Sequence, residues 1–161
     1  VLRRTRHPVV TLGRFGPYGA PEFDNADPRG PKAFLQFRAF VTNTGRMLVN
    51  HVGVELTVPR PLAGREVRSR MAGIGETIHT QRPGRLTFFR YHPVPLFPSQ
   101  EIYAVSLWVC LHKNNLSQVK GGAQVHWLIY ADDAVPVEGN LTLWDFQNVQ
   151  RAHTWVRGQL D

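Results

Sequence analysis

The residues whose type and spacing most favour binding chemistry are seven arginines between positions 60 and 90. Guanidinium groups bind phosphates and carboxylates bidentately, and a basic segment can neutralise phosphates without reading their sequence. The aromatic residues Phe88, Phe89 and Tyr91 lie close by in the chain and are suited to stacking on bases. The segment therefore predicts a site for nucleic acid or another polyanion, which comprises Arg60, Arg65, Arg68, Arg70, Arg82, Arg85 and Arg90.

The same arginines can also be explained without a binding site. The formal net charge is +7, and only three of the 19 basic residues are lysines. A GC-rich genome produces such an excess of arginine, and net charge alone argues for solubility and non-specific affinity. The segment is then a solvated loop or one that packs on a partner domain, and its strand aromatics belong to the core.

Carboxylates gather in two further segments, which hold Asp24 with Asp27 and Asp132 with Asp133 and Glu138. Calcium needs six to eight oxygen ligands, so these residues could form a site only if both segments meet at one edge. Aspartate in such turns ordinarily accepts hydrogen bonds from nearby backbone N–H groups. The sequence therefore predicts turns here and no metal site.

Neither catalysis nor a cofactor is indicated by the remaining motifs. The histidines follow no zinc-ligand spacing, and GxSxG, Walker A and GxGxxG patterns are absent. Cys110 with His112 or His126 is the one nucleophile arrangement worth considering, but Cys110 falls within an apolar strand, where a buried structural thiol is favoured. We expect no catalytic residue and no cofactor. A single cysteine allows no intrachain disulfide and favours a reducing compartment, hence a cytoplasmic location.

Strict alternation of apolar residues identifies the elements that must position these side chains. Val52, Val54, Leu56 and Val58 alternate with Gly53, Glu55 and Thr57, which predicts a strand with one buried face. Further strands are predicted around 33–41, 76–80, 86–91, 103–111, 125–130 and 141–143. Short strands separated by Gly, Pro, Asn and Asp are typical of an all-β antiparallel sandwich of six to eight strands, Ig-like or C2-like.

Three segments divide the chain. Residues 1–31 are rich in Gly and Pro and are predicted to form an irregular basic arm with an edge strand near 9–12. Residues 32–147 form the sandwich, and 148–161 a tail with a short helix. No run of about 18 apolar residues predicts a spanning helix. The start VLRRTRHPVV has no apolar core and no Met, and it is interpreted as a segment within a longer protein.

Three stretches, NTGRMLVNHVGVELTVP, PLFPSQEIY and WLIYADDAVPVEGNLTL, carry a resemblance to a known family. Their order resembles the β-sandwich region at the C-terminus of bacterial Schlafen/AlbA-type proteins, which are described as binding DNA and ATP. The resemblance covers about residues 33–147 and rests on turn patterns, so no site residue is transferred. It implies an accessory module in a longer chain.

The sequence thus favours a non-enzymatic binding or sensor domain of a larger bacterial protein, docked to another domain or protein through strand edges or aromatic loops. The first alternative is a nucleic-acid or polyanion-binding module that uses the arginines at 60–90. The second alternative is an enzyme on a sandwich scaffold with an unrecognised site.

Overall fold

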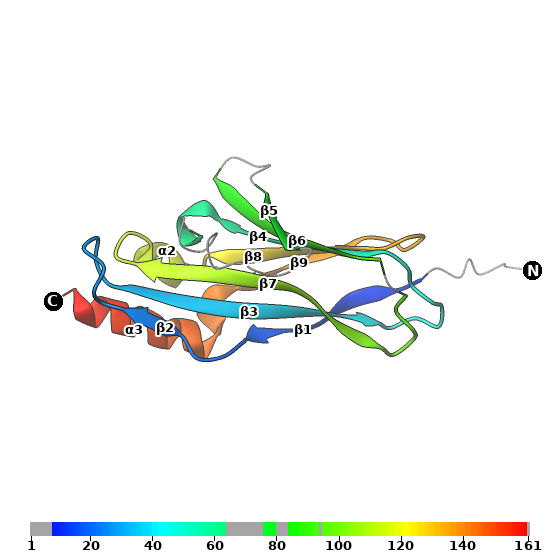
Figure 1. Cartoon of the computed structure of the whole chain (residues 1–161), viewed down its shortest axis with the longest axis horizontal. Helices are drawn as coiled ribbons and strands as arrows, with labels where there is room; N and C mark the ends of the chain where they lie inside the picture. The colour runs from blue at the N-terminus through cyan, green and yellow to red at the C-terminus, as the bar shows by residue number, and fades with distance from the viewer. Residues whose placement is uncertain (1–7, 64–75, 80–83, 94, 161) are drawn as a thin grey trace, which may run out of the picture.

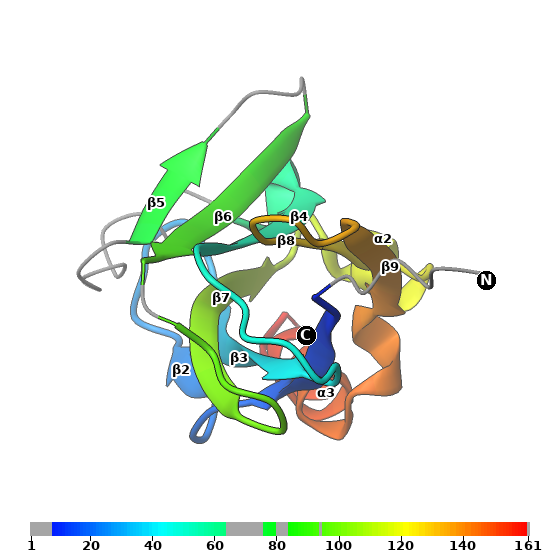
Figure 2. The same ribbon diagram turned by 90° about the vertical axis from the view of Figure 1, so that its right-hand side faces the viewer.

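The computed structural model describes residues 8–63, 76–79, 84–93 and 95–160. In this part of the chain, a four-stranded and a five-stranded antiparallel sheet face each other (Figure 1; Figure 2). The all-β antiparallel sandwich predicted from the sequence is therefore confirmed.

The smaller sheet is built on one long strand. Strand β3 (Lys32–Asn43) lies between β7 (Glu101–His112) on one side and two shorter strands on the other, β1 (Val10–Pro17) and β2 (Glu22–Asp24). Odd-numbered residues of β3 point into the core: Ala33, Leu35, Phe37, Ala39 and Val41 are all buried. The even-numbered residues therefore form the outer face, as period-two alternation requires.

The larger sheet has the order β5 (Glu76–His79), β6 (Arg85–His92), β4 (Val52–Pro59), β8 (Gln124–Tyr130) and β9 (Val137–Thr142). The predicted buried face of β4 is found: its valines and Leu56 have no exposed surface. They pack with Leu86 and Phe88 of β6 and with Val125 and Ile129 of β8 in the core between the sheets.

Two glycines of this sheet lie beneath aromatic rings. Gly53 pairs with Tyr130, and a Cβ on Gly53 would lie 2.3 Å from that ring. Gly139 pairs with Trp127, and a Cβ there would lie 2.7 Å from the indole. These close approaches require glycine, which explains why a residue typical of turns lies inside each strand.

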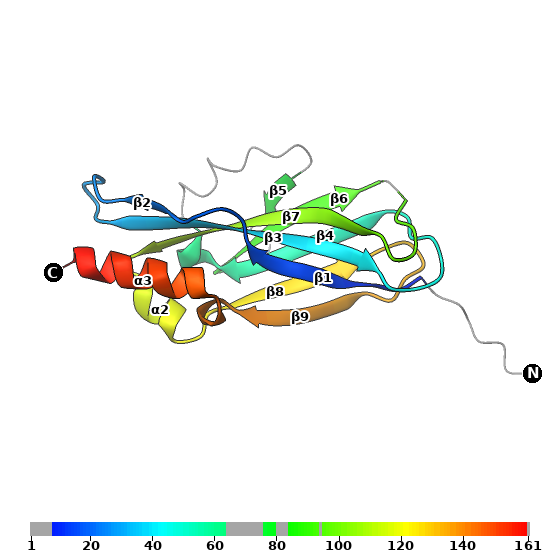
Figure 3. The ribbon, with the colours of Figure 1, turned by 90° about the horizontal axis from the view of Figure 1, so that it is seen from below.

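One end of the sandwich is covered by helices. Short helical turns η1 (Arg60–Leu62), η2 (Leu143–Asp145) and α2 (Leu116–Lys120) precede α3 (Gln147–Gln159), which runs along the end of β3 beside β2 (Figure 1; Figure 3). Trp155 of α3 packs on Phe23, and His153 contacts the Trp144 ring edge to face. Burial lowers the pKa of His153, whose Nε2 lies 3.2 Å from the Leu116 carbonyl.

Local structure differs from expectation in three places. Residues 10–17 form a complete strand in the segment expected to be mostly irregular, and residues 116–120 form a helix in an expected loop. Strand β9 begins at Val137, within a stretch expected to be a turn. The tail holds the expected helix, 13 residues long.

Candidate functional site

The structure describes only three of the seven arginines of the predicted site. Arg65, Arg68, Arg70 and Arg82 lie outside the described residues. Arg60 and Arg85 lie side by side and exposed at one end of the β4–β6 pair, where Arg60 N–H donates to the Gly84 carbonyl at 2.8 Å. Arg90 lies at the opposite end of β6 and pairs with Val54. The described members of the predicted cluster therefore occupy two separate places.

The aromatic residues near this segment do not form one platform. Phe88 is fully buried in the core. Phe89 and Tyr91 lie on the outer face of the larger sheet, where Phe89 stacks with Tyr130 and Tyr91 with His51. Alternation along β6 places Arg90 on the opposite side of the strand from both of them.

Arg90 instead reaches an aromatic ring of the smaller sheet. Its guanidinium lies 5.3 Å from the centre of the Tyr103 ring of β7. Strands β6 and β7 approach each other here, because His92 Nε2 lies 2.8 Å from the Ala104 carbonyl. Arg90 of the predicted segment therefore contacts Tyr103, which belongs to a group of side chains that the sequence analysis did not identify.

That group lies on the outer face of the smaller sheet, and we call it the arginine–aromatic face: Arg14, Tyr18, Arg38, Phe40 and Tyr103. Arg38 lies 3.3 Å above the centre of the Tyr18 ring and 4.8 Å from that of Tyr103. Arg14 lies 4.2 Å above the Phe40 ring, and Phe40 meets Tyr103 edge to face at 6.0 Å. Two guanidinium groups are thus held against rings along one sheet surface.

Strand register places these side chains together. Arg14 of β1 pairs with Phe40 of β3, and the next outward pair is Gly16 with Arg38. On the other side of β3, Phe40 pairs with Tyr103 of β7. Paired residues point to the same face of a sheet, so three strands contribute to one surface. Tyr18 joins it because its N–H donates to the Gln36 carbonyl at 2.8 Å.

The two arginines of this face differ in their partners. Arg14 forms an ion pair with Glu101 at 2.6 Å. Arg38 has no ion-pair partner among the described residues, and its Nε is buried without a hydrogen-bond acceptor. A buried N–H without an acceptor costs free energy. Within the described part of the chain, the Arg38 guanidinium thus has aromatic neighbours but no anionic one.

A shallow open groove of about 630 Å³ runs over β1 at this point. Gly16 is among its lining residues, and a Cβ added there would meet nothing within 4 Å. Arg14, Tyr18, Arg38 and Phe40 line it as well. The half-exposed Tyr18 ring and the Arg38 guanidinium therefore lie next to each other in a groove that is open to solvent.

The two acidic segments do not meet. The turn with Asp24 and Asp27 lies between β2 and β3, and Asp132 and Asp133 follow β8 at the other end of the sandwich (Figure 1; Figure 3). Among the described residues, no group of three His, Cys, Asp or Glu side chains could hold a metal ion.

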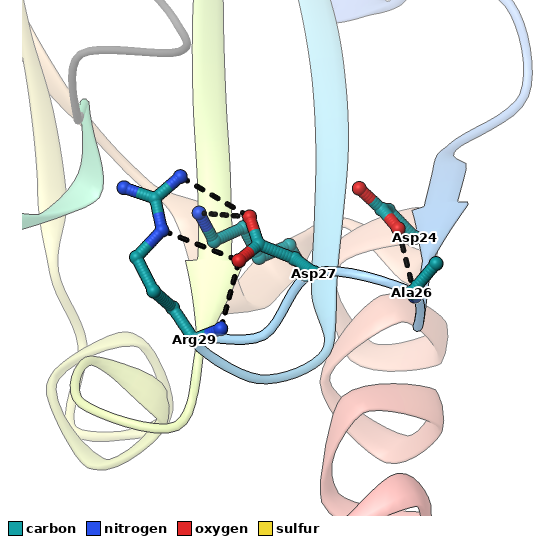
Figure 4. Close-up of polar contacts among 5 residues, drawn as sticks. Asp24, Ala26, Asp27 and Arg29 are labelled. Atoms are coloured by element: carbon teal, nitrogen blue, oxygen red, sulfur yellow. Dashed lines mark hydrogen bonds and ion pairs between the residues drawn. The ribbon is translucent and has the colours of Figure 1, made fainter.

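Instead, four of these five carboxylates have a local partner. Asp27 accepts from the Arg29 side chain and backbone and pairs with Lys32 at 3.0 Å, and Asp24 accepts from the Ala26 N–H (Figure 4). Asp132 pairs with His51, and Glu138 lies 3.2 Å from His126.

The Asp27 ion pair predicts a pH-dependent stability. Hydrogen bonds from the Arg29 side chain and backbone, and then from Lys32, hold the pKa of Asp27 well below its usual range. Because the folded pKa is depressed, the stabilisation is present above pH of about 4 and is lost as the pH falls toward the folded value. We expect Asp27→Asn to lower the urea midpoint at pH 7, because it removes the carboxylate that pairs with the buried Lys32 ammonium, and to lower it less at pH 3.

Asp133→Asn is the matched control for this prediction. Asp133 is exposed at φ +60°, a conformation that asparagine also tolerates, and the substitution removes the same charge. Equal urea midpoints for Asp27→Asn and the parent chain at pH 7 would show that the ion pair does not stabilise the fold.

The residues of the considered nucleophile arrangement lie in both sheets. Cys110 and His112 belong to β7 in the smaller sheet, and Cys110 is 1% exposed. His126 belongs to β8 in the other sheet, where it contacts Glu138. His112 Nδ1 accepts from the Asn114 N–H at 3.2 Å.

Comparisons with known proteins leave the family open. No protein-family model matches the chain, and no curated protein is significantly similar to it. Solved structures with partial similarity include a β-glucosidase from intestinal bacteria that is involved in saponin metabolism (14% identity, TM-score 0.28). Another is a β-glucosidase from Kluyveromyces marxianus in complex with glucose (13% identity, TM-score 0.25).

The matches cover 84% and 86% of this chain but only 16% and 14% of the glucosidase chains. The chain thus spans a small part of their length, and the low TM-scores do not establish a shared fold. Within the described part of the chain, every helix is too short or too polar to cross a bilayer.

Proposed function

We propose that this chain is a non-enzymatic binding domain of a larger bacterial protein, and that it docks an anionic partner on its arginine–aromatic face. The observation that carries the proposal is Arg38, whose guanidinium lies over the half-exposed Tyr18 ring and has no ion-pair partner among the described residues. A guanidinium in this state is preorganised, so less rotamer entropy is lost when it binds a carboxylate or phosphate.

The charge around the face supports an anionic partner. Arg14 and Arg38 belong to it, and Arg90 approaches it through Tyr103. The chain as a whole carries a formal charge of +7, which steers anions toward it. Because the side chains stand on paired strands rather than on loops, their spacing is set by the sheet.

The alternative site at 60–90 has less support from the described residues. Arg60 and Arg85 are exposed at one end of β6, and Arg90 is at the other. Of the described arginines in that segment, Arg90 is the one that joins the aromatic surface. Polyanion binding is therefore proposed at the sheet face, with Arg90 at its margin.

Two glycine substitutions test the proposal with equal changes in charge. Gly16→Glu adds a carboxylate to the lining of the groove, on the residue that pairs with Arg38, and Gly158→Glu adds one on α3, where a Cβ also meets nothing within 4 Å. We expect Gly16→Glu to weaken binding of labelled polyglutamate or oligothymidylate by about tenfold or more, since a charge-assisted contact is lost. Fluorescence anisotropy measures the affinity.

Gly158→Glu should leave the affinity within about twofold, because it lowers only the net charge, far from the groove. An equal loss for both variants would mean that the anions bind non-specifically. Failure of every anionic polymer to bind the parent chain would overturn the proposed function.

A further inference from the structure

Resting on that proposed function, we infer that the anionic partner is single-stranded nucleic acid, with a phosphate on Arg38 and a base stacked on Tyr18. The inference starts from the Tyr18 ring. The guanidinium of Arg38 lies 3.3 Å above one side of it, yet the residue is 50% exposed. The opposite side of the ring is therefore open to solvent and to a planar ligand.

Stacking also orients the Arg38 guanidinium. When its plane lies against a ring, its N–H groups point outward along the plane, where they can bind a phosphate with two parallel hydrogen bonds. Arg38 and Tyr18 are adjacent in the groove, so a phosphate and its neighbouring base can be bound together. This pairing of cation and ring is how non-specific single-strand sites are built.

A second phosphate position lies one step along the sheet. Arg14 and Arg38 are diagonal neighbours on β1 and β3, a relation that separates Cα atoms by about 7–8 Å. Glu101 partly neutralises Arg14, so Arg38 carries the stronger interaction. A single nucleic-acid strand that lies across the groove can therefore place one phosphate at Arg38 and another at Arg14.

The exposed Tyr18 ring favours single-stranded nucleic acid over a duplex or an acidic peptide. A duplex hides the faces of its bases, so it could use the arginines but not the Tyr18 ring. An acidic peptide offers carboxylates and no planar base, and it would likewise leave the ring without a partner. A single strand supplies both phosphates and exposed bases, and it matches every part of the groove.

The test compares two oligomers with the same phosphates. Oligothymidylate and an abasic strand of equal length are titrated against the parent chain by fluorescence anisotropy. We expect oligothymidylate to bind about tenfold more tightly, because only its bases can stack on the Tyr18 ring. This comparison needs no variant and does not depend on how any variant folds.

Variants then locate the effect. Tyr18→Leu should weaken oligothymidylate binding by about tenfold and abasic binding by a smaller factor, because it removes the stacking ring and also the ring that orients Arg38. Tyr91→Leu is the matched control, because Tyr91 is 45% exposed on the outer face of the other sheet. Arg38→Gln should weaken both oligomers and reduce the slope of affinity against salt by about 1. Thermal unfolding by circular dichroism checks that each variant is folded.

The outcomes separate this inference from the proposed function. Equal affinity for the two oligomers would overturn base stacking and leave anionic docking in place. Binding of polyglutamate without binding of either oligonucleotide would overturn the nucleic-acid assignment in favour of an acidic protein. Absence of binding to all three probes would overturn the proposed function as well.

Discussion

Replacing Asn115 by alanine is expected to lower the free energy of unfolding by about 3 kcal/mol, because a buried amide would leave main-chain groups without partners. The Asn115 side chain has no exposed surface. Its Nδ2 donates to the carbonyls of Cys110 at 2.8 Å and Pro61 at 3.0 Å, and its Oδ1 accepts from the His112 N–H at 3.0 Å. Alanine can replace none of these hydrogen bonds.

The neighbouring residue supplies the control. Asn114 is exposed, and only its backbone N–H makes a hydrogen bond, to His112. Asn114→Ala should change the free energy of unfolding by less than about 0.5 kcal/mol. Urea titrations of both variants at one pH give the comparison. Similar losses for Asn114→Ala and Asn115→Ala would show that the buried hydrogen bonds are not what stabilises this turn.

This asparagine pair shows where prediction from sequence ends. Two asparagines after a strand indicate a turn, and a turn follows β7. The Asn115 amide bonds to Cys110 and His112 nearby in the chain and also donates to the Pro61 carbonyl of η1, which comes from a distant part of the chain. Nothing local in the sequence encodes that last contact.

The sandwich itself was predictable because burial of one face forces a period of two. The apolar residues of β4 lie on the inner face, as do Val105, Leu107, Val109 and Leu111 of β7. Tyr103 departs from the alternation and lies on the outer face beside Phe40, because the β3–β7 register shifts there. Strand β9 escaped prediction because Gly139 and Asn140 are typical turn residues. The Trp127 ring across the pair needs that glycine, so a tertiary contact overrides the local preference.

The candidate site was less accessible to sequence reasoning than the fold. Alternation along β3 does place Arg38 and Phe40 on the outer face, and a cation beside a ring was a usable signal. Tyr18 lies in a Gly- and Pro-rich stretch whose pairing with β3 follows from register rather than from composition. The arginines at 60–90 drew attention by number, although number does not show which side chains share a surface.

Phe37→Ala is expected to cost about 4 kcal/mol of folding free energy, the largest loss we predict for a single side chain. Phe37 is fully buried, stacks on Phe15 at 5.4 Å between ring centres and meets Phe146 edge to face at 5.3 Å. Each aromatic pair adds about 0.5–1.5 kcal/mol to the burial of the ring. Phe97→Ala, at a residue that is 58% exposed, should cost less than about 1 kcal/mol and is the control in the same urea titration.

Phe37→Ala should also destabilise the arginine–aromatic face, because the Phe37 ring supports β1. Phe15 is the residue of β1 between Arg14 and Gly16, and its ring packs on both Phe37 and Phe146. Without the Phe37 ring, β1 keeps its ladder with β3 and its buried Val10, but Phe15 loses one of its two aromatic partners. Amide hydrogen exchange should therefore accelerate more in β1 than in β4, whose core residues belong to the opposite sheet. Uniform acceleration in both strands would mean that Phe37 stabilises the whole sandwich and gives β1 no particular support.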